Sequence, residues 1–336
     1  MGCWYNEKVE GSKIAVSTRI RLARNLDGVP FPSRMTQAQR KEVNEQIKNA
    51  IEQSNTPFSK SLKFIMMSDV PENERYSMVE RHIISPEFAN GSEGRAIILS
   101  DDEVISIMIG EEDHIRIQVV LAGLQLEKAY DIAERLDTLL CESLNLAFDE
   151  RLGFLTECPT NLGTGLRASV MLHLPATENA GQIDSISSSV NKIGFVVRGM
   201  YGEGSKSVAS LYQISNQITL GISEKNALDN LKIITSQLME KEKKLRENIN
   251  RLKAEDMAMR ALGTLKSARI LDSAEMMKLL SEITLGMDIG VIDDNNIMPV
   301  KLLVEGQPYM LMRKYGIMGP DERDIYRATM VRNALE

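Results

Sequence analysis

The chain has 336 residues, a formal net charge of -7 and a pI near 5.3. Its length favours two domains, and the acidic balance argues against a nucleic-acid-binding protein because no basic surplus is available to displace counterions from a phosphate backbone. Three scattered cysteines predict neither a disulfide framework nor a zinc site, and no apolar stretch approaches the ~18 residues of a membrane span. We therefore expect a cytoplasmic protein with no membrane segment, no nucleic-acid partner and no metal site of its own.

Short runs rich in β-branched residues predict strands in the first two thirds of the chain, at residues 94–100, 103–109, 114–120 and 194–198. Residues 110–113 separate two of these runs and predict a hairpin connection. The segment 121–146 has the apolar periodicity of a helix. Strands and helices in this order indicate an α+β fold.

The composition changes at Ser223. No proline occurs between Pro175 and Pro299, and leucines recur every seventh residue at Leu231, Leu238, Leu245 and Leu252. This spacing predicts one long amphipathic helix that packs within a helical domain or a dimer. We place a domain boundary here, with residues 1–222 forming one domain and residues 223–336 forming a helical C-terminal domain.

Arginines gather in short motifs, the first of which is Ser17-Thr18-Arg19-Ile20-Arg21. Taken alone, it is most simply a solvated strand edge. On a strand, however, Arg19 and Arg21 would face the same ligand. Arginine also binds phosphate through two parallel hydrogen bonds, whereas lysine offers a point charge. The same chemistry is available to Arg116, Arg167 and Arg198.

Glu111 and Glu112 follow Gly110 in the predicted hairpin connection, where ordinary turn carboxylates are common. A chemical role is the alternative. A guanidinium stays protonated in proteins, so it can attack phosphorus only if a nearby carboxylate orients it and accepts its proton. Cys158 is similarly either a small buried apolar residue or a thiolate favoured by neighbouring cations.

Together these motifs resemble the phosphagen kinases, and most closely the bacterial protein arginine kinases of the McsB type. The resemblance implies a catalytic domain with an antiparallel β-sheet flanked by helices, and it makes Glu112, Glu203 and Cys158 catalytic. Gly110 replaces the asparagine of the family's Asn-Glu-Glu-Asp-His motif, which leaves the geometry of the hairpin open. The implied ATP-binding residues are Ser17, Thr18, Arg19, Ile20, Arg21, His82, Arg116, Arg167, Ala168, Ser169, Val170, Met171, Arg198, Gly199, Met200, Tyr201, Gly202 and Glu203.

The C-terminal motif Arg323-Asp324-Ile325-Tyr326-Arg327-Ala328 would ordinarily be an exposed, salt-bridged helix turn. In the protein arginine kinases, an Arg-Asp-x-x-Arg-Ala motif forms an allosteric phosphoarginine pocket. The resemblance therefore assigns that role to Arg323, Asp324, Arg327 and Ala328. The i, i+4 spacing of the two arginines would let them converge on one phosphoryl group.

The expected function is transfer of the ATP γ-phosphate to arginine guanidinium groups in proteins, with Mg²⁺ held mainly by the nucleotide. A metabolite phosphagen kinase and a non-catalytic phosphoarginine-binding adaptor are the alternatives. Because the first arginine motif begins at Ser17, we expect no additional N-terminal helical domain enclosing a small substrate. The resemblance implies a homodimer, a zinc-binding activator protein and the Clp protease as partners, with stress-response targets; the individual substrates and the need for an activator stay open.

Overall fold

The computed structural model describes residues 3–7, 13–54, 61–199, 207, 209–293 and 297–336. The chain divides into two compact units, each described by itself below. The first comprises Met1–Trp4, Ser17–Ser169 and Ser215–Lys232, and the second comprises Tyr5–Val16, Val170–Ile214 and Ile233–Glu336. Several elements pass from one unit into the other, so neither unit is a single continuous segment of the chain.

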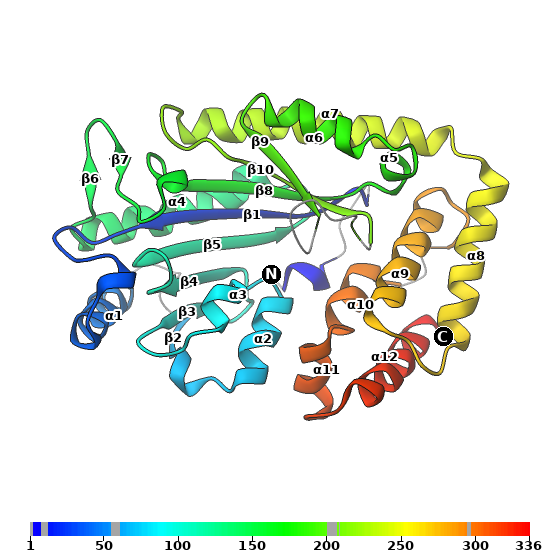
Figure 1. Ribbon diagram of the computed structural model, residues 1–336, viewed down its shortest axis with the longest axis horizontal. Coiled ribbons are helices and arrows are strands. Elements are labelled where there is room, and N and C mark those ends of the chain that lie inside the picture. The colour runs from blue at the N-terminus through cyan, green and yellow to red at the C-terminus, as the bar shows by residue number, and fades with distance from the viewer. Residues whose placement is uncertain (1–2, 8–12, 55–60, 200–206, 208, 294–296) are drawn as a thin grey trace. The chain divides into compact units, whose positions relative to one another are not determined.

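The first unit is built on a β-sheet with the neighbour order β2-β3-β4-β5-β1-β8 (Figure 1). The pairs β1–β5, β2–β3, β3–β4 and β4–β5 are all antiparallel. The strands are β1 (Ala15–Arg24), β2 (Leu62–Met66), β3 (Ala96–Ser100), β4 (Ile105–Ile109), β5 (Ile115–Ala122) and β8 (Leu166–His173), with a separate hairpin of β6 (Phe148–Asp149) and β7 (Gly153–Phe154).

Helices pack on this sheet. The helix α4 (Leu126–Ser143) lies against β5, and α1 (Gln37–Glu52) packs on α4. A buried ion pair of 2.7 Å between Arg24 of β1 and Asp137 of α4 adds to the apolar contact. The short helices α2 (Glu72–Glu80) and α3 (Pro86–Ala89) form a core cluster with Ile97 and Met108 of the sheet. The antiparallel sheet flanked by helices confirms the predicted α+β class.

The predicted hairpin is confirmed. Strands β4 and β5 pair from Ile109 opposite Ile115, and residues 110–114 make the connection. Gly110 has φ +78°, and a side chain there would meet its nearest atom at 3.5 Å. Glycine and asparagine both adopt this left-handed conformation readily, so the replacement of asparagine by glycine is compatible with the hairpin.

The second unit combines two strands with a helical bundle. The strand β9 (Phe195–Gly199) neighbours β10 (Leu211–Asn216), which neighbours β8. In the bundle, α8 packs against α9 and α12, and α10 packs against α9. Among the described residues, no helix is long and apolar enough to cross a membrane. The helix α7 (Glu224–Glu247) begins in the first unit and continues into the second from Ile233. The other helices of the second unit are α5 (Pro175–Asn179), α6 (Ile183–Asn191), α8 (Arg251–Ser267), α9 (Ser273–Asp288), α10 (Pro299–Glu305), α11 (Pro308–Tyr315) and α12 (Pro320–Leu335).

The prediction of one helix through all four heptad leucines is wrong at its end. The helix α7 stops at Glu247, and Leu252 lies on α8 with 76% of its surface exposed. A new helix begins because Asn250 caps it, accepting a hydrogen bond of 3.0 Å from the Lys253 amide. Leu231 and Leu238 are buried as expected.

Candidate active site

One face of the sheet in the first unit presents arginines from neighbouring strands. On β1, Arg19 and Arg21 alternate with the buried Ile20. The register pairs Arg21 with Gln118 and Ala23 with Arg116 of β5. Opposite residues in an antiparallel pair share a face, so Arg116 projects on the same side as the two β1 arginines.

Arg167 of β8 completes a cluster of four cations, which we call the phosphate cluster: Arg19, Arg21, Arg116 and Arg167. Burial, then the charges of Arg116 and Arg167, lower the pKa of Arg19 to about 10. The same causes, with Arg19 added, lower the pKa of Arg21 well below its usual value. The Arg21 Nε is buried and has no hydrogen-bond partner among the described residues. Like charges held this close favour a polyanionic ligand.

The carboxylates of the β4–β5 connection meet this cluster. Arg116 forms ion pairs of 2.5 Å with Glu111 and 2.8 Å with Glu112, the first without hydrogen-bond geometry. Ser85 donates a hydrogen bond to the other Glu111 oxygen. Glu111 is more enclosed than Glu112, whose side chain is 38% exposed. Glu112 is therefore the carboxylate that an external guanidinium could reach.

The connection is held by a hydrogen-bond network that the sequence did not reveal. Asn25, just after β1, donates to Asp113 at 2.7 Å and accepts from the His114 amide at 2.8 Å. His114 in turn accepts from the Leu26 amide at 3.0 Å. Burial raises the pKa of Asp113 and lowers that of His114. These residues orient the loop that presents Glu112. Of them, the sequence motif indicated only Asp113 and His114.

The loop of Cys158 is attached to the same connection. Asn161 donates to Glu112 at 3.3 Å, and the Glu157 amide donates to Asp113 at 2.9 Å. Cys158 is partly buried, and its Sγ lies 3.0 Å from Thr160 Oγ1. The structure thus brings the loop of Cys158, Glu112 and Arg116 to one neighbourhood.

His82 follows α2 and has φ +61°, a value that is uncommon for residues other than glycine. Its carbonyl accepts a hydrogen bond of 2.9 Å from Gln118, which lies on the arginine face of β5. Burial, and then the charge of Arg19, lower the pKa of His82 to about 3, so its ring is neutral at physiological pH. His82 therefore lies within electrostatic reach of the phosphate cluster.

The other predicted nucleotide residues fall into three groups. In the first unit, Thr18 donates to the Gly123 carbonyl at 2.7 Å and Ser169 donates to the Arg19 carbonyl at 3.4 Å, so both support the strands. Ser17, Ile20 and Ala168 are buried there. Val170 and Met171 of β8 and Arg198 and Gly199 of β9 belong to the second unit. Met200, Tyr201, Gly202 and the predicted catalytic Glu203 lie outside the described residues.

The C-terminal motif lies on α12. Arg327 is buried and donates from Nε to the Gly306 carbonyl and from Nη1 to the Leu271 carbonyl, both at 2.7 Å, and it also pairs with Asp324. Arg323 is only partly buried, and its Nη1 lies 4.0 Å from the sulfur of Met312. The two arginines thus differ in burial and partners, although their spacing puts them on one helix face.

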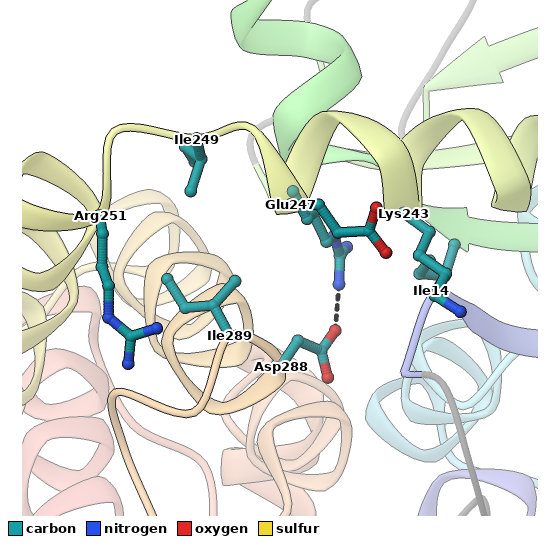
Figure 2. Close-up of a pocket in the computed structure, with 8 residues that line it drawn as sticks. Ile14, Lys243, Glu247, Ile249, Arg251, Asp288 and Ile289 are labelled. Atoms are coloured by element: carbon teal, nitrogen blue, oxygen red, sulfur yellow. Dashed lines mark hydrogen bonds and ion pairs between the residues drawn. The ribbon is translucent and has the colours of Figure 1, made fainter.

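The second unit also has a pocket of about 500 Å³ beside the end of α7 (Figure 2). None of the predicted catalytic or phosphate-binding residues lines it. Arg246 in its wall is already paired with Glu242 at 2.7 Å and with Asp288. Its lining residues are Ile14, Lys243, Arg246, Glu247, Ile249, Arg251, Asp288 and Ile289. The pocket does not contribute to the candidate active site.

The family model for the ATP:guanido phosphotransferase C-terminal catalytic domain matches residues 42–245 of this chain. The chain belongs to the ATP:guanido phosphotransferase family. A second family model, for the protein-arginine kinase McsB C-terminal domain, matches residues 251–336. The first match includes Glu112, Cys158, two members of the phosphate cluster, Arg116 and Arg167, and also Arg198 of β9.

Relatives cover nearly the whole chain. The protein-arginine kinase of Clostridium kluyveri is 46% identical over 328 residues, which are 96% of this chain and 94% of the relative. That of Halothermothrix orenii is 44% identical, over 96% of this chain and 93% of its own. These identities place the chain in the protein-arginine kinase branch of the family.

Solved structures have the same fold. The substrate-free duplicated taurocyamine kinase from Schistosoma mansoni gives a TM-score of 0.60 at 30% identity, over 68% of this chain and 33% of that duplicated chain. A lombricine kinase gives a TM-score of 0.62 at 25% identity, over 73% of this chain and 71% of its own. The predicted phosphagen-kinase-like fold is confirmed.

Proposed function

We propose that this protein transfers the γ-phosphate of ATP to arginine side chains of other proteins. The observation that supports it is the phosphate cluster with Glu112 at its edge: four cations share one sheet face, and a partly exposed carboxylate is held beside them by Arg116. A triphosphate carries about four negative charges and would relieve the mutual repulsion of these arginines. The names and high identity of the relatives support a protein substrate.

In the proposed reaction, the phosphate cluster and Arg198 bind the triphosphate and neutralise the charge that develops during transfer. Glu112 aligns the substrate guanidinium and accepts its proton as a guanidinium nitrogen bonds to the γ-phosphorus and the bond to ADP breaks. Glu203 is the proposed second carboxylate, and Cys158 positions the guanidinium without a covalent intermediate. Mg²⁺ would be held by the nucleotide, since the described residues contain no cluster of His, Cys, Asp or Glu suited to a metal ion.

The decisive experiment compares substrates. The full chain is incubated with Mg-ATP and either an unfolded arginine-rich protein or free arginine, and acid-labile phosphate is measured. We expect labelling of the protein. Labelling of free arginine alone would establish a metabolite kinase, which matters because the solved relatives above include taurocyamine and lombricine kinases. Binding of phosphoarginine without any transfer would establish an adaptor.

The matched variant is Glu112→Gln, which keeps the shape of the side chain and its contact with Arg116. Because glutamine cannot accept a proton, turnover should fall by about 10²- to 10⁴-fold. Binding of ATP, measured by titration calorimetry, should change little. Turnover equal to the wild type at saturating substrate would remove Glu112 from the proposed role.

We further propose that residues 1–222 form the catalytic domain and residues 223–336 a helical domain for dimerisation and regulation. In this domain, Arg323, Asp324, Arg327 and Ala328 would bind phosphoarginine. The family resemblance supports a homodimer that acts in the cytoplasm, marks stress-response targets for the Clp protease and responds to a zinc-binding activator. Analytical ultracentrifugation of the full chain tests the dimer.

A further inference from the structure

Trp4 is the only tryptophan of the chain and lies almost at its N-terminus, yet only 6% of its surface is exposed. The indole Nε1 donates a hydrogen bond of 2.9 Å to the Arg81 carbonyl. The indole therefore anchors the N-terminal segment to the end of α2.

Arg81, to which Trp4 is attached, is itself held by several contacts. The Arg81 side chain is buried, pairs with Glu74 at 2.7 Å and with Glu103, and also donates a hydrogen bond to Ser77 of α2. Cys3, beside Trp4, donates to the same Glu103 carboxylate at 3.4 Å. Two consecutive residues of the N-terminal segment are thus attached to one buried ion-pair network. Trp4 has a fixed orientation relative to Arg81 and to the residue that follows it.

That next residue is His82. The rings of Trp4 and His82 meet edge to face, with centroids 5.4 Å apart and an interplanar angle of 77°. The positive φ of His82 is costly for a residue with a side chain, so the surroundings must hold it. Gln118 holds the His82 carbonyl from the arginine face of β5, and Trp4 holds the ring.

A neutral imidazole suits this position. Burial and the charge of Arg19 lower the pKa of His82, so the ring adds no further cation to the four of the phosphate cluster. It keeps one N–H donor and one lone pair for a nucleotide. Such a ring contributes to binding only if its orientation is fixed, since an unrestrained side chain loses rotamer entropy when the ligand binds.

We propose that Trp4 is a positioning residue for nucleotide binding, whose indole holds His82 in the orientation that contacts a nucleoside triphosphate at the phosphate cluster. The inference rests on the proposed function and deepens it, because it extends the nucleotide site to a residue outside every motif of the family resemblance. The structural alternative is that Trp4 only fills the core beside α2.

A double-mutant cycle separates the two roles. The full chain is compared with Trp4→Leu, His82→Ala and the double variant, by KM for ATP and kcat at saturating ATP. A lost hydrogen bond typically changes affinity by up to roughly tenfold, so we expect Trp4→Leu to raise the KM for ATP by about that factor with kcat within about twofold. In the His82→Ala background, Trp4→Leu should have no further effect on KM.

The matched control is Phe88→Leu, a fully buried residue of the core cluster that includes Ile83. It should lower the midpoint of urea unfolding while leaving the KM for ATP unchanged. If Phe88→Leu raises KM as much as Trp4→Leu does, or if the effects of Trp4→Leu and His82→Ala on log KM simply add, Trp4 is a core residue and the proposal fails.

Tryptophan fluorescence gives an independent readout, because Trp4 is the sole emitter of its type. Titration of ATP into the wild-type chain should change its emission with the same midpoint as calorimetry, and His82→Ala should abolish that change while measurable ATP binding persists. An emission spectrum that stays constant while calorimetry detects ATP binding overturns the role of Trp4. Absence of ATP binding in calorimetry would instead overturn the proposed function itself.

Discussion

Each unit of the molecule contains arginines withdrawn from solvent, buried in the second unit and partly buried in the first, and their charged neighbours differ. In the second unit, Arg246 pairs with Glu242 and Asp288 and donates to the His173 carbonyl at 2.9 Å. In the first unit, burial and the charges of neighbouring arginines lower the pKa of Arg19 and of Arg21. The carboxylates of Glu111 and Glu112 form ion pairs with Arg116 of the same cluster. The arginine of the second unit is thus paired with carboxylates of the chain itself. In the phosphate cluster, by contrast, arginines lie close enough to one another to lower the pKa of Arg19 and of Arg21.

This difference distinguishes arginines that stabilise the fold from arginines that bind a ligand. A buried charge whose partners are all supplied by the fold is part of the folded architecture, and removing it leaves its partners unpaired. A buried excess of one sign costs stability and persists where a ligand of opposite sign completes it. Arg246 and Arg21 are therefore expected to respond to substitution in opposite ways.

The largest effect on stability is expected at Arg246. Arg246→Met leaves the fully buried Glu242 carboxylate without its cation, and breaking such a pair costs about 3–5 kcal/mol of unfolding free energy. Urea denaturation measures it. The double variant Glu242→Gln/Arg246→Met should recover part of the loss, because the fully buried side chain of residue 242 is then uncharged, although Asp288 still loses its ion pair with Arg246. A cost for Arg246→Met no larger than that of a surface substitution would show that the network is not structural.

The matching change in the phosphate cluster is Arg21→Met. Removing one of four mutually repelling cations should leave the urea midpoint unchanged or raise it. Affinity for ATP should fall, since a hydrogen bond to a charged group contributes about 1.5–3 kcal/mol, or roughly 10- to 150-fold in the dissociation constant. Titration calorimetry measures this fall. A destabilised variant with unchanged ATP affinity would reverse the assignment of the two sites.

The two arginines of the α12 motif test whether one helix can contain both an arginine that stabilises the fold and an arginine that binds a ligand. Arg327 is held by two carbonyls and Asp324, whereas Arg323 is partly exposed. Arg323→Ala should therefore abolish phosphoarginine binding at α12 without unfolding the chain, while Arg327→Ala should also lower the urea midpoint. Coupling to kinase activity should amount to about 1–3 kcal/mol. Wild-type phosphoarginine binding by Arg323→Ala, with the ATP site blocked, would contradict the assignment.

The smallest effect is expected at Cys158. Serine can keep the contact with Thr160 but stays neutral where a thiolate is charged. For Cys158→Ser we expect an unfolding free energy within about 0.5 kcal/mol of wild type. Turnover should be roughly tenfold lower, which corresponds to about 1.4 kcal/mol. The measurement is the pH profile of kcat. If rate and profile both match the wild type, Cys158 is a packing residue.

The sequence predicted the parts of this molecule that depend on neighbours in the chain. Alternation placed Arg19 and Arg21 on one face of a strand, and the β4–β5 hairpin followed from two apolar runs around Gly110. It could not predict bonds between side chains and distant backbone, such as Gln118 to the His82 carbonyl. The heptad of leucines gave a wrong prediction of one continuous helix, because Asn250 caps a new helix within the heptad. At a helix boundary, capping outweighs periodicity.

The buried Glu242 also has a consequence for the order of folding. Its carboxylate accepts hydrogen bonds from the Ala176 and Thr177 amides, at 3.1 and 2.8 Å, and so completes the first turn of α5. A helix of five residues is too short to persist alone in water. Its cap comes from more than sixty positions later in the chain, so we expect α5 to form only once α7 has docked. Native-state hydrogen exchange of these two amides would then report the opening of α7 rather than local fraying.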